Sequence, residues 1–176
     1  KKYGVSLLND CKYGFDVKGN TMRISVIHGP TYPDPEADRG RHELLYSLYP
    51  HQGTWKEAET ARKSYELNNP LLARVVIAHP GKLPSCHSFI RVEPENVIIS
   101  SLKKESGYYN RGIILRMYEI SGKKTEAKLT LPWPVSVIET DLTERPLKKL
   151  EVKGETISLT LEPFEIKTLR LTQYPH

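Results

Sequence analysis

The sequence lacks the features that mark disulfide-rich, zinc-bound and membrane-spanning proteins. It has 2 cysteines among 176 residues, too few for a disulfide framework or a zinc site of their own. A reduced, cytoplasmic protein is therefore the expectation, with one long-range bridge between Cys11 and Cys86 left open. No apolar run approaches the roughly 20 residues that cross a bilayer, so we expect no membrane span. The chain begins Lys1-Lys2-Tyr3-Gly4, without Met or an apolar signal region, which predicts a piece of a longer polypeptide.

Charge of one sign is not concentrated anywhere in the chain. The formal net charge is +5 and the pI is about 9.1, values that could suggest a nucleic-acid partner. However, the basic residues stand singly or in pairs such as Lys103-Lys104 and Lys148-Lys149, usually with a glutamate nearby. This pattern is typical of a solvated surface, so we expect no nucleic-acid binding.

Recognisable catalytic motifs are missing as well. The sequence has no P-loop, dinucleotide-binding glycine motif, Gly-x-Ser-x-Gly elbow or His-Glu-x-x-His helix. His28, Asp34, Asp38, His42 and His51 fall in one short region, which leaves a metal site there as a minor alternative. A proline-rich loop gives no sign that three or four ligands converge, so surface or hydrogen-bonded histidines are the preferred interpretation. We therefore predict neither catalytic residues nor a metal or other cofactor in this chain.

Aromatic residues make up 9% of the chain, and they offer a weak alternative role. Aromatic faces could stack on sugar rings, but core packing is the simpler interpretation for Trp55 and Trp133. Tyr108-Tyr109, between Gly107 and Asn110, is predicted to lie at an exposed hairpin tip.

The first half of the chain reads as β-structure with a long loop. Residues 5–8 and 21–27 are strand-like, and Lys18-Gly19-Asn20 supplies turn chemistry for a hairpin between them. Residues 29–40 contain three prolines, which predicts a long exposed loop of the kind that carries function or contacts a partner. Residues 42–49 alternate and predict a strand that ends at Pro50.

One helix is predicted, near residues 55–68. Thr54 and Glu57 have the spacing of a capping box, and apolar residues recur at helical spacing after it. Asn68-Asn69-Pro70 ends the helix. Residues 71–78 again look like a strand, and the segment 80–84 is rich in Pro and Gly. This segment predicts a domain boundary, with one domain at residues 1–84 and another at 85–176.

The second domain is predicted to be a β-sandwich. Seven short strands follow at regular spacing without a helix, a pattern typical of that fold; they are residues 89–92, 97–102, 112–119, 125–131, 135–140, 156–161 and 165–171. Ser121-Gly122 and Lys153-Gly154 predict tight hairpin turns. The apolar phase of the last strand breaks, which predicts a bulge near Lys167-Thr168. The fold class is thus all-β, mainly an antiparallel β-sandwich, with one short helix.

Several long motifs, in the right order, strongly resemble the C-terminal region of α-mannosidases of glycoside hydrolase family 38. The motifs lie at residues 3–20, 33–40, 46–51, 96–101, 112–118, 141–146 and 163–171. Together they cover nearly the whole chain.

The resemblance implies a retaining exo-hydrolase that removes α-linked mannose. In the family, zinc and the nucleophilic aspartate belong to an N-terminal α/β barrel, which is followed by a helical domain and then large β-sandwiches. Such a barrel needs strands alternating with helices over 200 residues or more, which this chain does not have. The resemblance therefore implies a non-catalytic C-terminal part, inactive alone, whose partners are the catalytic and helical domains of the same polypeptide and a mannose-containing oligosaccharide. A free-standing carbohydrate-binding module is the alternative.

Residues 1–84 correspond, on this resemblance, to the tail of a large β-supersandwich. Their sheet would be incomplete, so we expect exposed apolar surface or unpaired strand and association into a homo-oligomer.

A substrate-proximal role is also implied for part of this region. Family members commonly end the strand at 21–27 with an arginine near the sugar-binding end of the barrel, whereas this sequence has His28, which lacks the bidentate fork. Asp34 and Asp38 are the other candidates, followed by Asn9 and Asp10. The alternative is that they stabilise loops or an interdomain contact.

Overall fold

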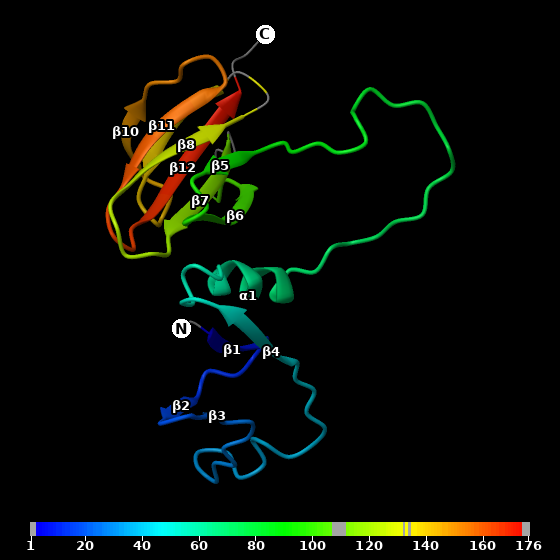
Figure 1. The fold of residues 1–176 in the computed structure, drawn as a ribbon. Coiled ribbons are helices and arrows are strands. Elements are labelled where there is room, and N and C mark those ends of the chain that lie inside the picture. Colours follow the sequence, from blue (N-terminus) through cyan, green and yellow to red (C-terminus); the bar gives the residue numbers. More distant parts are fainter. Residues whose placement is uncertain (1–2, 107–111, 132, 134, 174–176) are drawn as a thin grey trace. The chain divides into compact units, whose positions relative to one another are not determined.

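The chain divides into two compact units in a computed structural model that describes residues 3–106, 112–131, 133 and 135–173. The first unit ends at Val76 and the second begins at Ile77, whereas the sequence places the boundary after residue 84. Both units consist mainly of antiparallel strands, and the one helix of the described residues is short (Figure 1). The predicted all-β fold class with one short helix is confirmed. No described helix is long and apolar enough to cross a bilayer.

The first unit contains two small sheets and the helix. Its elements are β1 (Tyr3–Asn9), β2 (Phe15–Lys18), β3 (Thr21–Ile24), β4 (Tyr46–Gln52) and α1 (Thr60–Asn68). β1 pairs only with β4 among the described strands, and β2 pairs with β3 around Gly19, whose φ of 62° is one that glycine adopts easily. The predicted hairpin between residues 5–8 and 21–27 is therefore wrong, because the turn at residues 18–20 joins β2 to β3.

The sheet formed by β1 and β4 is covered on one face only. On the helix side, Ser6 Oγ lies 3.0 Å from Thr60 Oγ1, and the Tyr49 hydroxyl donates to the Ala58 carbonyl at 3.1 Å. The opposite face carries Tyr46 and Leu48, each 61% exposed. Leu8 is the sole buried apolar residue among those described in this unit. The exposed apolar surface that we expected here is confirmed.

Three local predictions for the first unit need correction. The capping box forms, with the Thr54 N–H donating to Glu57 Oε2 at 2.6 Å, but α1 starts only at Thr60 because Glu59 takes a left-handed conformation with φ 50°. The strand predicted at 42–49 is shifted to β4 and continues through Pro50, which an edge strand tolerates. Residues 71–78 form no strand.

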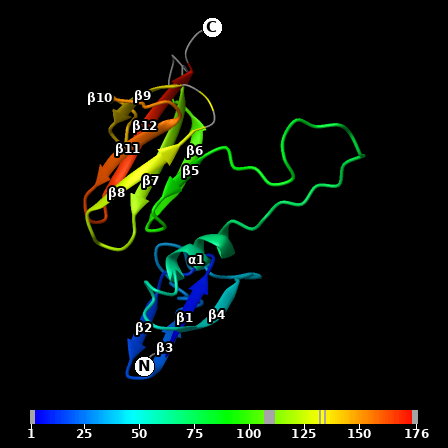
Figure 2. The ribbon, with the colours of Figure 1, turned by 45° about the horizontal axis from the view of Figure 1, so that its top comes forward.

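The second unit is the predicted β-sandwich. It contains β5 (Arg91–Glu93), β6 (Val97–Lys104), β7 (Ile113–Glu119), β8 (Thr125–Thr130), β9 (Val135–Thr140), β10 (Pro146–Leu150), β11 (Thr156–Leu161) and β12 (Ile166–Gln173). One sheet has the order β10-β9-β12-β7-β6 and the other β11-β8-β5 (Figure 2). A continuous apolar core includes Leu115, Leu129, Leu161 and Leu169, all fully buried. Burial on this scale is the main source of stability for such a domain.

All seven strands predicted for this unit are present, but β10 was missed. Four of its five residues are exposed, so it shows no apolar alternation. The turn at Lys153-Gly154 is confirmed by two reciprocal backbone hydrogen bonds between Lys153 and Thr156. The turn at Lys153-Gly154 nevertheless connects β10 of one sheet to β11 of the other, just as Ser121-Gly122 connects β7 to β8, so neither turn joins two strands that pair with each other.

The bulge predicted at Lys167-Thr168 is absent, since β12 pairs with β7 in unbroken register from Ile166 to Leu171. Ile166 is 53% exposed, and Lys167 takes the buried position instead. The Lys167 ammonium forms ion pairs with Glu139 at 2.9 Å and Glu165 at 2.8 Å. Because these carboxylates compensate a buried charge, the hydrophobic pattern alone misassigned the two faces at this end of the strand.

Glu119, a buried carboxylate at the end of β7, organises two turns. Its oxygens accept hydrogen bonds from the N–H groups of Ser121 (2.6 Å), Gly122 (2.7 Å) and Phe164 (3.1 Å), and from the Asn96 amide at 2.7 Å. Burial opposes ionisation, but these donors outweigh it and lower the pKa of Glu119 to about 2. The carboxylate therefore joins the turn that follows β7 to the turn that precedes β12.

The tryptophans differ from each other. Trp133 packs against the sandwich core, as predicted. Trp55 is 48% exposed, with the Lys56 ammonium 5.3 Å from its ring centroid, so its predicted core position is wrong. Tyr108 and Tyr109 lie outside the described residues.

Candidate functional site

An open hollow in the first unit brings together two of the five residues proposed from the sequence. His28 and Asp38 line this hollow, which has a volume of about 240 Å³. The other lining residues are Cys11, Lys12, Tyr13, Ser25, Val26, Ile27 and His42. The hollow forms where the backbone after β1 runs beside the backbone after β3, because the Ser25 N–H donates to the Gly14 carbonyl at 2.8 Å.

Asp38 connects the end of the proline-rich loop to the start of that loop, just after β3. Its Oδ2 accepts hydrogen bonds from the N–H groups of Gly29 at 2.6 Å and His28 at 3.2 Å. The hydrogen bond from Gly29, which has the larger effect, and the one from His28 both lower the pKa of Asp38. The Asp38 carbonyl oxygen also lies 2.9 Å from His42 Nε2. The ionised Asp38 carboxylate thus stabilises the loop by accepting these backbone hydrogen bonds.

Asn9 and Asp10 stabilise the turn that follows β1. Asn9 Oδ1 accepts hydrogen bonds from the N–H groups of Cys11 (3.1 Å) and Lys12. Asp10 Oδ1 accepts one from the Leu45 N–H at 3.0 Å. The hydrogen bond between the Cys11 thiol and Asp10 lowers the pKa of Asp10 and raises that of Cys11. Neither Asn9 nor Asp10 is among the described residues that line the hollow.

Asp34 lies apart from the hollow, within the loop itself. Its Oδ1 accepts a hydrogen bond from the Glu36 N–H at 2.9 Å, and its carbonyl accepts one from the Ala37 N–H at 3.3 Å. Such side-chain bonds to the backbone two residues onward are typical of aspartate in turns. The structure therefore gives Asp34 a local role in the loop.

The hollow offers hydrogen-bonding groups rather than a hydrolytic pair. Retaining glycoside hydrolysis uses two carboxyl groups about 5 Å apart, whereas Asp38 is the single carboxylate among the described lining residues. Among the described residues no group of three or more His, Cys, Asp or Glu side chains is placed to hold a metal. Both cysteines are free and exposed. The imidazoles of His28 and His42 and the ammonium of Lys12 remain as groups suited to a polar ligand.

Lys12 and Tyr13 were missed as lining residues, and His42 was considered only as a metal ligand. The signal that could have found them is the register of β2 and β3, in which Phe15 faces Ile24. Extending that register places residues 11–14 opposite residues 25–28. Assigning the turn at residues 18–20 to the wrong strand pair hid this proximity.

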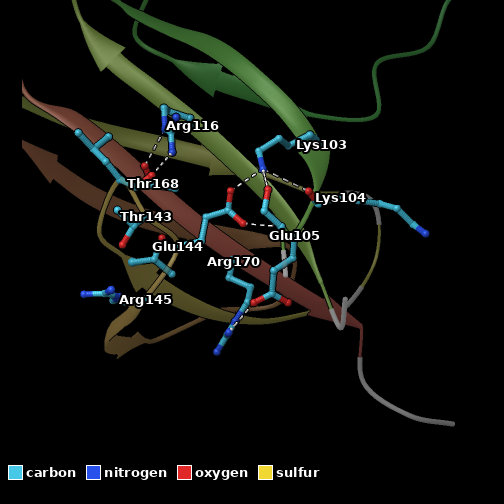
Figure 3. Close-up of polar contacts among 12 residues, drawn as sticks. Lys103, Lys104, Glu105, Arg116, Thr143, Glu144, Arg145, Thr168 and Arg170 are labelled. Atoms are coloured by element: carbon cyan, nitrogen blue, oxygen red, sulfur yellow. Dashed lines mark hydrogen bonds and ion pairs between the residues drawn. The ribbon is translucent and has the colours of Figure 1, made fainter. Parts of the chain in front are cut away.

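A second polar cluster lies on the outer face of the sandwich (Figure 3). Lys103 pairs with Glu144, which also accepts the Ser106 N–H at 2.5 Å, and Arg170 pairs with Glu105 at 2.7 Å. Arg116 donates to Thr168 Oγ1 at 2.9 Å and to the Leu142 carbonyl at 3.0 Å. Lys103 and Arg170 are thus paired with carboxylates, and Arg116 binds neutral oxygens, so we interpret the cluster as one that stabilises the connection between β9 and β10.

Comparison with known proteins gives family matches at both ends of the chain. Residues 1–36 match the model described as the glycosyl hydrolases family 38 C-terminal domain, and residues 96–169 match that of the family's C-terminal β-sandwich domain. Human alpha-mannosidase 2C1 is 37% identical over 98% of this chain. Alpha-mannosidase from Saccharomyces cerevisiae is 33% identical over 96% of it. Each alignment takes in 17% of the relative, so the chain spans about a sixth of the length of these relatives.

Solved structures show the same fold. The crystal structure of an alpha-mannosidase from Enterococcus faecalis superimposes with a TM-score of 0.74 at 22% identity, over 96% of this chain and 20% of that one. A glycosyl hydrolase family 38 protein from the same organism gives a TM-score of 0.72 at 20% identity. In both comparisons nearly all of this chain superimposes on about a fifth of a longer chain.

Proposed function

Because this chain belongs to glycosyl hydrolase family 38, we propose that it is the non-catalytic C-terminal part of a retaining exo-α-mannosidase that hydrolyses terminal α-linked mannose. The observation that carries the proposal is the alignment of 96–98% of the chain with 16–17% of proteins named alpha-mannosidases.

The task of this chain is then scaffolding. Its partners are the catalytic and helical domains of the same polypeptide, and the substrate is a mannose-containing oligosaccharide. The described side chains do not fit a metal site, so zinc belongs to the catalytic domain in this proposal. We also place the enzyme in cytoplasmic mannose metabolism, since the two free cysteines suit a reducing compartment.

One loop of the first unit is proposed to reach the substrate pocket. His28 and Asp38 are the strongest candidates because they share the hollow with Lys12 and His42. Asp34 supports that loop through its backbone hydrogen bond, whereas Asn9 and Asp10 accept backbone hydrogen bonds beside the end of β1. In the full-length enzyme, His28→Ala is expected to raise KM for an oligomannoside with little change in kcat. Arg41→Ala, an exposed residue of the same loop region outside the hollow, is the control.

The direct test of the main proposal is an activity assay. The 176-residue chain, incubated with an aryl α-mannoside and zinc, is expected to show no turnover, whereas the full-length polypeptide from the same gene is active and loses activity with a chelator. Metal-dependent turnover by the 176-residue chain alone would contradict the proposal.

The second candidate function is a free-standing carbohydrate-binding module. The polar hollow lined by His28, Lys12 and Asp38 favours it. A module of this kind would show a rise in Tm on titration with mannose or mannobiose, and that rise would disappear in His28→Ala. A flat titration up to millimolar sugar removes this candidate and leaves the scaffold.

A further inference from the structure

The segment that follows α1 is apolar and fully open to solvent. Residues 71–77 read Leu-Leu-Ala-Arg-Val-Val-Ile, and among the described residues they belong to no helix or strand. Leu71 is 100% exposed, Leu72 97% and Val75 99%. Removing an aliphatic side chain of this kind from water is favourable. The exposure of this apolar run therefore indicates that residues 71–77 pack against a surface that this chain does not supply.

The sequence of this segment has the pattern of an internal strand. In an extended conformation Leu71, Val75 and Ile77 lie on one face, which is wholly apolar. Leu72 and Val76 lie on the other face, which is apolar apart from Arg74 between them. Strands buried on both faces read as continuous runs rich in Val, Ile and Leu, whereas a half-buried strand alternates with polar residues. Pro70 and Pro80 bound the run, and every residue between them has a backbone N–H with which to join a ladder.

The segment is not an appendage peculiar to this chain. The human relative aligns over 98% of the chain, so the unaligned residues are too few to contain it. It lies between the two family-model matches, which end at residue 36 and begin again at residue 96. The human relative that aligns in this way is about six times longer than this chain.

We propose that residues 71–77 form an internal strand of a β-sheet built by the part of the family 38 polypeptide outside this chain. This inference rests on the proposed function, because it requires the longer polypeptide. A second copy of this chain is less suited to supply that sheet. Its open edges belong either to two-stranded sheets or to sandwich sheets with one face on the core. Adding a strand to either would cover at most one of its two apolar faces.

Amide hydrogen exchange on the 176-residue chain and on the full-length polypeptide from the same gene tests the proposal. In the chain alone, residues 72–77 are expected to exchange near their intrinsic rates; in the full-length polypeptide, about 100-fold or more slowly. Strands β7 and β12 serve as internal references that are protected in both samples. Fast exchange of 72–77 in the full-length polypeptide overturns the proposal, and so does protection already present in the chain alone.

Paired variants of the full-length polypeptide give a second measurement. Val75→Asp would place a charge inside the sheet and is expected to lower Tm by several degrees, whereas Leu83→Asp, at an exposed apolar residue beyond the segment, leaves it unchanged. Where Val75→Asp prevents folding, Val75→Thr keeps the shape and is expected to give a smaller decrease. Equal Tm for all three variants would overturn the strand. If the unmutated full-length polypeptide showed no α-mannosidase activity, that result would instead count against the proposed function.

Discussion

The two units of this chain bury very different amounts of apolar surface. In the second unit, thirteen described residues form one buried apolar cluster between two sheets, whereas in the first unit Leu8 is the single buried apolar residue described. The strands are equally regular in both units. The difference teaches that strand pairing does not make a stable domain by itself, since a two-stranded sheet needs a second layer on its apolar face.

The largest expected effect compares one leucine from each unit. Leu169→Ala removes a fully buried side chain from the sandwich core and should cost about 3–5 kcal/mol of unfolding free energy. Leu48→Ala, at a 61% exposed site of β4, should cost less than about 1 kcal/mol in the 176-residue chain. For the sandwich, urea unfolding is followed by Trp133 fluorescence in a Trp55→Phe background. For the first unit, the stability loss is measured by hydrogen exchange of the β4 amides in urea. Equal losses would break the comparison.

The next effect concerns the buried carboxylate of the second unit. Because the folded-state pKa of Glu119 is lowered to about 2 from 4.5, its contribution is fully present above pH 4.5 and is lost as the pH falls toward 2. Glu119→Gln sets an amide N–H₂ against backbone N–H donors, so it should cost on the order of 2–3 kcal/mol at pH 7. It should also flatten the dependence of stability on pH between 4.5 and 2.

Glu155→Gln, at an exposed glutamate of the same unit, is the control for that measurement and should leave the pH dependence unchanged. If stability between pH 2 and 4.5 fell equally in Glu119→Gln and in the wild type, the anchoring role of Glu119 would be wrong.

A smaller effect is expected at the buried cation of β12. Lys167→Met leaves Glu165 without this ion pair and Glu139 with only Lys148 at 3.3 Å, so a loss of about 1–2 kcal/mol is expected at pH 7. Adding Glu139→Gln should restore part of it, because the largely buried Glu139 carboxylate, left with Lys148 alone, is then replaced by a neutral amide. A double-mutant cycle by thermal unfolding measures the coupling, and strict additivity would show that the pair contributes nothing.

The smallest effect belongs to the first unit. The pKa of Asp38 is lowered by the N–H groups of Gly29 and His28, so this stabilisation is present above the ordinary aspartate pKa and is lost as the pH falls below it. Asp38→Asn keeps one acceptor oxygen and should speed the exchange of the Gly29 amide only a few-fold at pH 7. The amides of β7 should be unaffected, and a change there would mean that the units are energetically coupled.

Sequence reasoning succeeded where apolar alternation and turn chemistry agree. The seven predicted sandwich strands are present because their buried faces carry residues such as Ile157, Leu159 and Leu161 at every second position. The prediction failed where a polar residue holds a buried position, as Lys167 does, or where a strand is exposed along its length, as β10 is. Residues 71–78 were predicted as a strand from composition alone, and the partner that would make them one is not in this chain.

The candidate site was only partly accessible from the sequence. His28 and Asp38 were proposed from the family resemblance, and the structure places both on the hollow. Lys12 and Tyr13 were not found, because their approach to residues 25–28 depends on a strand pairing that was misassigned. Asn9 and Asp34 accept hydrogen bonds in local turns, which short-range sequence patterns do reveal. Asp10 accepts one from Leu45, which is distant in the sequence. Whether any of the five contacts substrate stays a prediction.

The most direct test of the account is to compare amide exchange of β1 and β4 with that of β7 and β12 in the 176-residue chain and in the full-length polypeptide. We predict that β7 and β12 are strongly protected in both samples, while β1 and β4 are weakly protected in the 176-residue chain and become strongly protected only in the full-length polypeptide. Protection of β1 and β4 in the short chain equal to that of β7 would show that the first unit is complete without the rest of the enzyme, and would contradict the account.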